Sequence, residues 1–208
     1  MTLTSATIRD YDARAADRET TATATFGLGC FWGPDARFGA MDGVVRTCVG
    51  YAGGTTPDPS YHSLGDHTEV VQVEFDPDVV EYQELLTDVF QQHDPQTQPS
   101  KRQYQNVVFA STPTQRTAID AVLATIGHTP DDIETRIEQL SQFHPAEDYH
   151  QKYRLRSASS FMSAFEEAGY ADAEIRDSAI AAKLNGYIAG HTVDIETDLL
   201  APDQQASG

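Results

Sequence analysis

Lysine is scarce in this sequence, and acidic residues outnumber basic ones more than twofold. The 208 residues include 14 Lys and Arg, of which only Lys101, Lys152 and Lys183 are lysines, against 32 Asp and Glu. The net charge is −18, which argues against nucleic-acid binding because a phosphate backbone requires a basic face. An acidic, lysine-poor surface favours solubility where salt screens its self-repulsion, so we predict a salt-adapted protein.

Cysteine is also scarce, since the chain contains only Cys30 and Cys48. A disulfide scaffold requires more cysteines in a shorter secreted chain. A zinc site built on thiolates requires paired spacing such as C-x-x-C, which is absent, so no metal is expected. Each cysteine is therefore either a buried apolar side chain or a reactive thiol.

Long apolar runs are missing as well. No stretch approaches the roughly 20 apolar residues of a membrane span. The first 20 residues include Arg9, Asp10, Arg14, Asp17 and Glu19, without the apolar run of a secretory signal. We therefore expect a cytoplasmic protein without a membrane partner.

Apolar periodicity and turn residues outline the secondary structure. Alternating patterns predict strands at 21–30, 44–51, 69–75, 105–110 and 133–140. Helical spacing predicts helices at 34–41, 79–92, 113–127, and near 160–168 and 175–185. Residues 1–20 are charged and aperiodic, which is typical of a mobile or loosely packed lead-in. The interleaving of strands and helices indicates a layered α/β or α+β domain.

Cys30 lies where a predicted strand meets a turn into a helix that Pro34 can begin. Backbone N–H groups and the helix dipole favour the thiolate at such a position. Phe31 and Trp32 follow directly, and an aromatic depression beside the thiol suits a small apolar group such as a methyl. The alternatives are a buried filler cysteine and two rings that simply pack.

Glu69 shares strand phase with Val71, Val73 and Phe75, so it is predicted to point inward. Partial burial favours the neutral, proton-donating carboxyl group. The alternative is a solvated Glu69 just before the strand.

The sequence resembles methionine sulfoxide reductase A over about residues 24–153. The matching segments are residues 26–33 (Phe-Gly-Leu-Gly-Cys-Phe-Trp-Gly), 43–54, 59–61, 67–71, 75–77, 93–95, 103–104 and 146–151. The resemblance implies an α+β fold, a two-layer α/β sandwich with a mixed, largely antiparallel sheet and a ferredoxin-like core. It also implies a catalytic domain at 21–153 between the lead-in at 1–20 and a helical, acidic C-terminal extension at 154–208.

The same resemblance implies a role for each site residue. Cys30 matches the nucleophile, Phe31 and Trp32 match residues that hold the S-methyl group, and Glu69 matches the acid that protonates the sulfoxide oxygen. Tyr61 and Tyr104 match hydroxyls that hydrogen-bond this oxygen. Methionine would leave with Cys30 as a sulfenic acid. The resemblance further implies that the substrate is the S epimer of methionine sulfoxide, either free or in oxidised proteins. It implies no bound cofactor, and thioredoxin or another dithiol as the reductant. We expect a monomer.

Two features depart from the family pattern. The loop at 96–102 is short and lacks the Asp that the family usually has there. No cysteine follows Cys48, so either Cys48 or an outside thiol must resolve the sulfenic acid. Two rival hypotheses are a degenerate member that only binds sulfoxide or senses oxidants, and a cysteine hydrolase that uses Cys30 with His144 or His150 and an acid such as Asp148.

Overall fold

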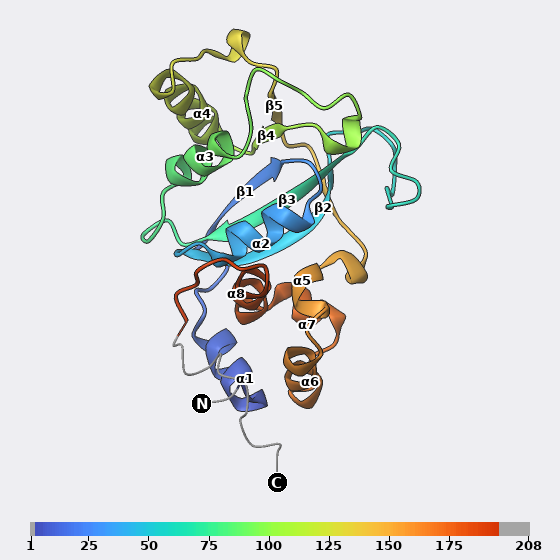
Figure 1. Cartoon of the computed structure of the whole chain (residues 1–208). Helices are drawn as coiled ribbons and strands as arrows, with labels where there is room; N and C mark the ends of the chain where they lie inside the picture. The colour runs from blue at the N-terminus through green and yellow to red at the C-terminus, as the bar shows by residue number, and fades with distance from the viewer. Residues whose placement is uncertain (1–2, 196–208) are drawn as a thin grey trace.

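Figure 1 shows the fold in a computed structural model, which describes residues 3–195. The helices are α1 (Ser5–Arg14), α2 (Trp32–Ala40), α3 (Tyr82–Gln91), α4 (Pro113–Thr125), α5 (Tyr153–Arg156), α6 (Ser159–Glu167), α7 (Asp172–Asp177) and α8 (Ala179–Ile188). The strands are β1 (Ala22–Gly27), β2 (Val44–Ala52), β3 (Thr68–Phe75), β4 (Val107–Ala110), β5 (Arg136–Gln139) and β6 (Phe143–Pro145). Short 3₁₀ turns are η1 (Arg102–Tyr104), η2 (Pro130–Asp132) and η3 (Asp148–His150).

The strands form one sheet in the order β5-β4-β1-β3-β2-β6. Only β4 and β5 pair in parallel, and the other pairs are antiparallel. This confirms the predicted mixed, largely antiparallel sheet. The succession β1-α2-β2-β3-α3-β4, with β1 and β3 at the centre, is typical of a ferredoxin-like core.

One face of the sheet is covered by α2, α3 and α4, and the main core lies there. Phe26, Val71 and Val73 project from the strands into this core, since residues two apart share a face. Helix α3 adds Leu85 and Val89, both fully buried, at the spacing that predicted the helix. The remaining helices form a second layer beneath α2 (Figure 1).

The N-terminal lead-in is more ordered than predicted, because α1 occupies Ser5–Arg14 and Ile8 is fully buried. Ile8 packs in a cluster with Phe165 of α6 and Leu184 of α8. A helix of ten residues has little stability alone, and its partners lie more than 150 residues away, so local periodicity does not reveal it. The C-terminal region is helical as predicted through α8, and the part of 154–208 beyond residue 195 lies outside the described residues.

Element boundaries differ from the prediction where turns intervene. The strand expected at 21–30 ends at Gly27, because Gly29 adopts a φ of 74° that breaks the extended chain. The strand expected at 133–140 begins at Arg136, and the three-residue β6 was missed because it is too short to show alternation. In the described part, none of the helices has the length and apolar character needed to cross a bilayer.

Candidate active site

Cys30 lies between the end of β1 and the start of α2, and it is exposed. Burial of the sulfur against its neighbours still raises the pKa of the Cys30 thiol above its ordinary value. The backbone N–H of Trp32 and the charge of Arg154 act in the opposite direction but do not outweigh this desolvation. The predicted effect of the helix N-terminus is therefore present, yet the free site favours the thiol over the thiolate.

Glu69 is 1% exposed, which confirms the predicted inward orientation. Its Oε2 accepts a hydrogen bond from the backbone N–H of Phe31 at 3.1 Å, and its Oε1 accepts one from Gln103 Nε2 at 2.6 Å. Burial raises the pKa of Glu69, although these two hydrogen bonds and Lys101 pull the pKa down. A carboxyl group that resists ionisation is thus fixed to the residue next to Cys30, as a proton donor requires.

The two aromatic residues after Cys30 have different surroundings. Phe31 is 2% exposed and packs against Tyr51 and His150, with ring centroids 6.0 and 5.2 Å away. Trp32 is half-buried and stacks on Tyr153, with centroids 3.7 Å apart and an interplanar angle of 4°. The Trp32 Nε1–H donates to His150 Nδ1 at 3.3 Å, so the indole lines the site while Phe31 packs inward.

Tyr61 and Tyr104 lie at the same site from two loops. The Tyr61 ring lies beside that of His150, with centroids 4.7 Å apart, and Tyr104 directly follows Gln103, which donates to Glu69. Desolvation, followed by the charges of Glu69, Tyr61 and Cys30, raises the pKa of Tyr104. The backbone N–H of Tyr61 donates to Glu147 Oε1 at 2.9 Å. Tyr61, Tyr104 and Glu69 thus lie in the same region as Cys30.

Gln103, Glu147 and Tyr153 also lie at this site without a predicted role, and His150 was predicted only as a hydrolase base. Glu147 also accepts from Tyr51 Oη at 2.8 Å. His150 is 2% exposed, its buried Nε2 has no hydrogen-bond partner among residues 3–195, and burial lowers its pKa. The sequence signal for Glu147 and His150 was the family-like segment 146–151. Their contacts at the site could not be predicted, because Trp32, Tyr51 and Tyr61 are far from this segment in sequence.

Cys48 lies on the other face of the sheet. On β2, Val49 pairs with Val71 and Tyr51 pairs with Glu69, whereas Cys48 pairs with Gln72. Since adjacent strand residues face opposite ways, Cys48 points away from Glu69 and α2. Burial raises its pKa to about 11. A direct Cys30–Cys48 disulfide is inconsistent with this arrangement, because the sheet separates the two thiols.

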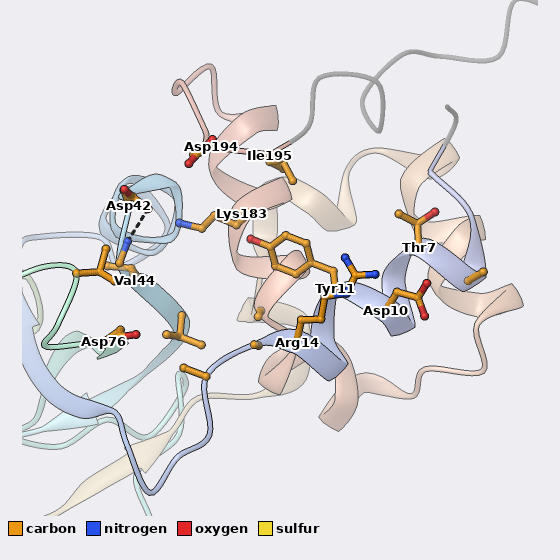
Figure 2. A pocket seen from close by; sticks show the side chains of 17 residues that line it. Thr7, Asp10, Tyr11, Arg14, Asp42, Val44, Asp76, Lys183, Asp194 and Ile195 are labelled. Atoms are coloured by element: carbon orange, nitrogen blue, oxygen red, sulfur yellow. Dashed lines mark hydrogen bonds between the residues drawn. The ribbon is translucent and has the colours of Figure 1, made fainter.

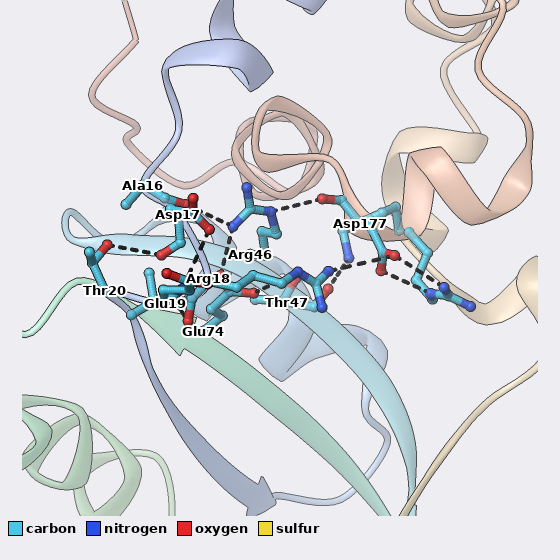
Figure 3. Close-up of polar contacts among 12 residues, drawn as sticks. Ala16, Asp17, Arg18, Glu19, Thr20, Arg46, Thr47, Glu74 and Asp177 are labelled. Carbon is cyan, nitrogen blue, oxygen red and sulfur yellow. Dashed lines mark hydrogen bonds and ion pairs between the residues drawn. The ribbon is translucent and has the colours of Figure 1, made fainter.

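The cavity beside Cys48 measures about 310 Å³ and is closed by charged side chains. Arg46 Nη1 donates to Glu74 Oε1 at 2.6 Å, and Arg46 Nε donates to the carbonyl oxygen of Asp177 at 3.0 Å (Figure 3). The charges of Lys152 and Arg176 act to lower the pKa of Cys48, but burial outweighs them, so this thiol resists ionisation.

A larger cavity of about 700 Å³ lies between α1, the turn after α2, and α8 (Figure 2). Tyr11, Asp42 and Lys183 line it, whereas Cys30 and Glu69 line neither cavity. Within residues 3–195, no cluster of three or more His, Cys, Asp or Glu side chains is arranged to hold a metal ion.

Comparison with known proteins places these residues in context. The family described as "Peptide methionine sulfoxide reductase" matches residues 22–184, which reaches beyond residue 153 into α8. The peptide methionine sulfoxide reductase of Drosophila melanogaster is 40% identical over 195 residues, covering 89% of this chain and 78% of the relative. The MsrA of Natronomonas pharaonis is 43% identical over 146 residues, covering 64% and 82%.

Two solved structures share the fold. Mxr1 from Saccharomyces cerevisiae in reduced form has a TM-score of 0.60 and 30% identity, covering 69% of this chain and 88% of that one. Methionine sulfoxide reductase A of Corynebacterium diphtheriae has a TM-score of 0.56 and 32% identity, covering 67% and 76%.

Proposed function

The chain belongs to the peptide methionine sulfoxide reductase family, and on this premise we propose that it reduces methionine S-sulfoxide, free or in proteins, with Cys30 as the nucleophile. The observation that carries the proposal is the buried Glu69, which is hydrogen-bonded to the backbone of Phe31 directly beside the thiol. The site thus joins a sulfur nucleophile, a carboxyl group with a raised pKa, and aromatic side chains.

In the first step, the Cys30 sulfur attacks the sulfur of the sulfoxide. Glu69 donates a proton to the sulfoxide oxygen, while Tyr61 and Tyr104 hydrogen-bond it, and Phe31 and Trp32 hold the S-methyl group. The oxygen then passes to Cys30 with the proton from Glu69, so methionine leaves and Cys30 becomes a sulfenic acid. The proton that the Cys30 thiol loses returns Glu69 to its neutral form. The substrate sulfur gains two electrons and the Cys30 sulfur loses two.

In the second step, an outside thiol resolves the sulfenic acid. Its sulfur bonds to the Cys30 sulfur and water leaves, which gives a mixed disulfide. The reductant is a dithiol of the thioredoxin kind. Its second thiol attacks its own first sulfur in the mixed disulfide, which forms a disulfide within the reductant and releases reduced Cys30. The position of Cys48 on the opposite face supports an outside thiol over Cys48 as the resolving group.

The test is turnover of each sulfoxide epimer by the wild type, Cys30→Ser and Cys48→Ser, with dithiothreitol and with thioredoxin. We expect only the S epimer to be reduced, Cys30→Ser to be inactive, and Cys48→Ser to turn over with both reductants. A wild type that reduces neither epimer would overturn the proposed function. A Cys48→Ser variant that fails only with thioredoxin would make Cys48 the resolving thiol.

The hydrolase hypothesis is not favoured by the geometry. Among residues 3–195, no hydrogen bond joins Cys30 to His144 or His150, and His150 Nδ1 accepts a hydrogen bond from Trp32.

The hypothesis that the chain only binds sulfoxide or senses oxidants is tested without reductant. The proposed enzyme loses one thiol per chain and releases one methionine when methionine S-sulfoxide is added. Binding of the sulfoxide without thiol loss would favour a binding module.

A further inference from the structure

A buried polar cluster lies behind the active site, centred on Asp35 in the first turn of α2. Asp35 is fully buried, as are Lys152 and Asn185. Asp35 Oδ1 accepts from Thr47 Oγ1 at 2.5 Å and lies 3.6 Å from Lys152 Nζ, and Oδ2 accepts from Asn185 Nδ2 at 3.0 Å. The helix that begins beside Cys30 is therefore tied to β2, to the chain before α5, and to α8.

Asn185 also holds the start of α5. Its Oδ1 accepts hydrogen bonds from the backbone N–H groups of Arg154 and Leu155, both at 3.0 Å. The first N–H groups of a helix have no hydrogen-bond acceptor within the helix. The Asn185 side chain supplies an acceptor for two of these groups in α5. One amide thereby joins the N-terminal turns of α2 and α5.

The backbone of α8 leaves Asn185 little freedom to move. A Cβ atom on Gly39 of α2 would collide with the carbonyl oxygen of Ala182, and one on Gly186 would lie 2.6 Å from that of Ala36. Such contacts require glycine on each helix. Helix α8 lies directly against α2 and beside α5 (Figure 1), so Asn185 occupies a fixed point between them.

The two joined helices each present one ring of the candidate substrate surface. Trp32 begins α2, Tyr153 begins α5, and the rings stack 3.7 Å apart. We propose that Asn185 is a positioning residue for sulfoxide binding, since its amide sets the distance between α2 and α5 and hence the Trp32–Tyr153 pair. This inference rests on the proposed function and extends it to a residue of the last helix.

Asn185 is expected to influence binding more than chemistry. Glu69 is held by the backbone N–H of Phe31 and by Gln103, whereas the hydrogen bonds of Asn185 go to Asp35, Arg154 and Leu155. Asn185→Ala should therefore raise KM for methionine S-sulfoxide about tenfold, which corresponds to about 1.4 kcal/mol. The kcat and the rate of Cys30 alkylation should stay within about twofold of the wild type.

Leu184→Ala is the matched control, because Leu184 is fully buried on the same helix but packs in the cluster with Ile8 and Phe165. It should lower Tm at least as much as Asn185→Ala and leave KM unchanged. An unchanged KM in Asn185→Ala, or an equal rise in Leu184→Ala, would overturn the inference. A wild type without turnover would instead refute the proposed function.

A double-mutant comparison tests the route of the effect. If Asn185 acts through Tyr153, Asn185→Ala should raise KM little further in a Tyr153→Ala background. Additive effects would show that Asn185 does not act through this stack. Should Asn185→Ala fail to fold, Asn185→Ser retains a hydroxyl at this position and is judged by the same KM and alkylation criteria.

Discussion

Comparison of Glu69→Gln with Glu69→Ala separates the proposed role of Glu69 as proton donor from its role as a hydrogen-bond acceptor in the fold. Both oxygens of the carboxyl group accept hydrogen bonds, from the Phe31 N–H and from Gln103. The amide introduced by Glu69→Gln retains both contacts, because its oxygen accepts from Phe31 and the Gln103 amide turns so that its oxygen accepts from the new NH₂ group. Neither variant has an acidic proton that it could transfer to the sulfoxide oxygen.

The expected magnitudes follow from these contacts. Loss of a general acid lowers kcat by about 10²–10⁴-fold, and this loss should be the same in both variants. Glu69→Ala leaves two donors without partners at about 1–3 kcal/mol each, so it should lower the free energy of unfolding by about 2–6 kcal/mol. Glu69→Gln should not.

The pH dependence distinguishes Glu69→Gln from the wild type. Burial raises the pKa of Glu69 in the folded state, so the folded chain binds more protons than the unfolded chain above the unfolded value of about 4.3. As the pH rises from about 4.3 toward the raised pKa of the folded state, the wild type should therefore lose stability relative to Glu69→Gln. Below about pH 4.3, the difference in the free energy of unfolding between the two proteins should no longer change with pH.

The assays are single-turnover reduction of methionine S-sulfoxide and urea unfolding at pH 5 and pH 8. Retention of turnover within tenfold of the wild type by Glu69→Gln would refute the role of Glu69 as proton donor. Equal stability of the Ala and Gln variants would show that the two hydrogen bonds do not fix this side chain.

Other ionisable groups at buried positions lead to three further predictions. Asp35→Asn leaves the buried ammonium of Lys152 without a counter-charge, so urea unfolding should show a loss of about 3–5 kcal/mol; a loss below about 1 kcal/mol would contradict the pairing. In Cys48→Ser, the alkylation rate of Cys30 should rise with pH around a midpoint above the ordinary thiol pKa of about 8.5, and a lower midpoint would contradict the desolvation argument. Burial lowers the pKa of Lys183 to about 8, so between pH 8 and about pH 10.4 the folded state binds fewer protons than the unfolded state. In unfolding experiments over this range, the wild type should gain stability relative to Lys183→Met as the pH rises. A difference in stability that does not change with pH would contradict the lowered pKa.

The inward position of Glu69 could be predicted from the sequence because a strand repeats every two residues and its neighbours in phase are apolar. The face of Cys48 could not, because simple alternation puts it in phase with Val44, whereas a β-bulge between Val44 and Arg46 leaves Val44 in the main core and turns Cys48 to the other face. Which face of β2 meets α2 depends on its register with β3, and register requires both strands. Strand phase therefore predicts faces only where an apolar pattern marks them.

The cluster around Asp35 was not visible in the sequence for a different reason. An Asp in the first turn of a short helix is ordinarily read as a solvated residue that complements the helix dipole. Its burial depends on Lys152 and Asn185, more than 110 residues away, and on the close contact at Gly39 and Gly186. Helix α1 was missed in the same way, since Ile8 packs in a cluster formed mainly by residues from the other end of the chain.

The link between α2 and α8 determines when the site is complete during synthesis. The ribosome makes Cys30 and Asp35 early, but Lys152 emerges more than 110 residues later and Asn185 later still. Until α8 has emerged and docked, Asp35 lacks one hydrogen-bond donor, and the first turn of α5 lacks the oxygen that accepts its N–H groups. The proposed nucleophile is thus among the first parts of the site to be made, and the side chains that support it are among the last.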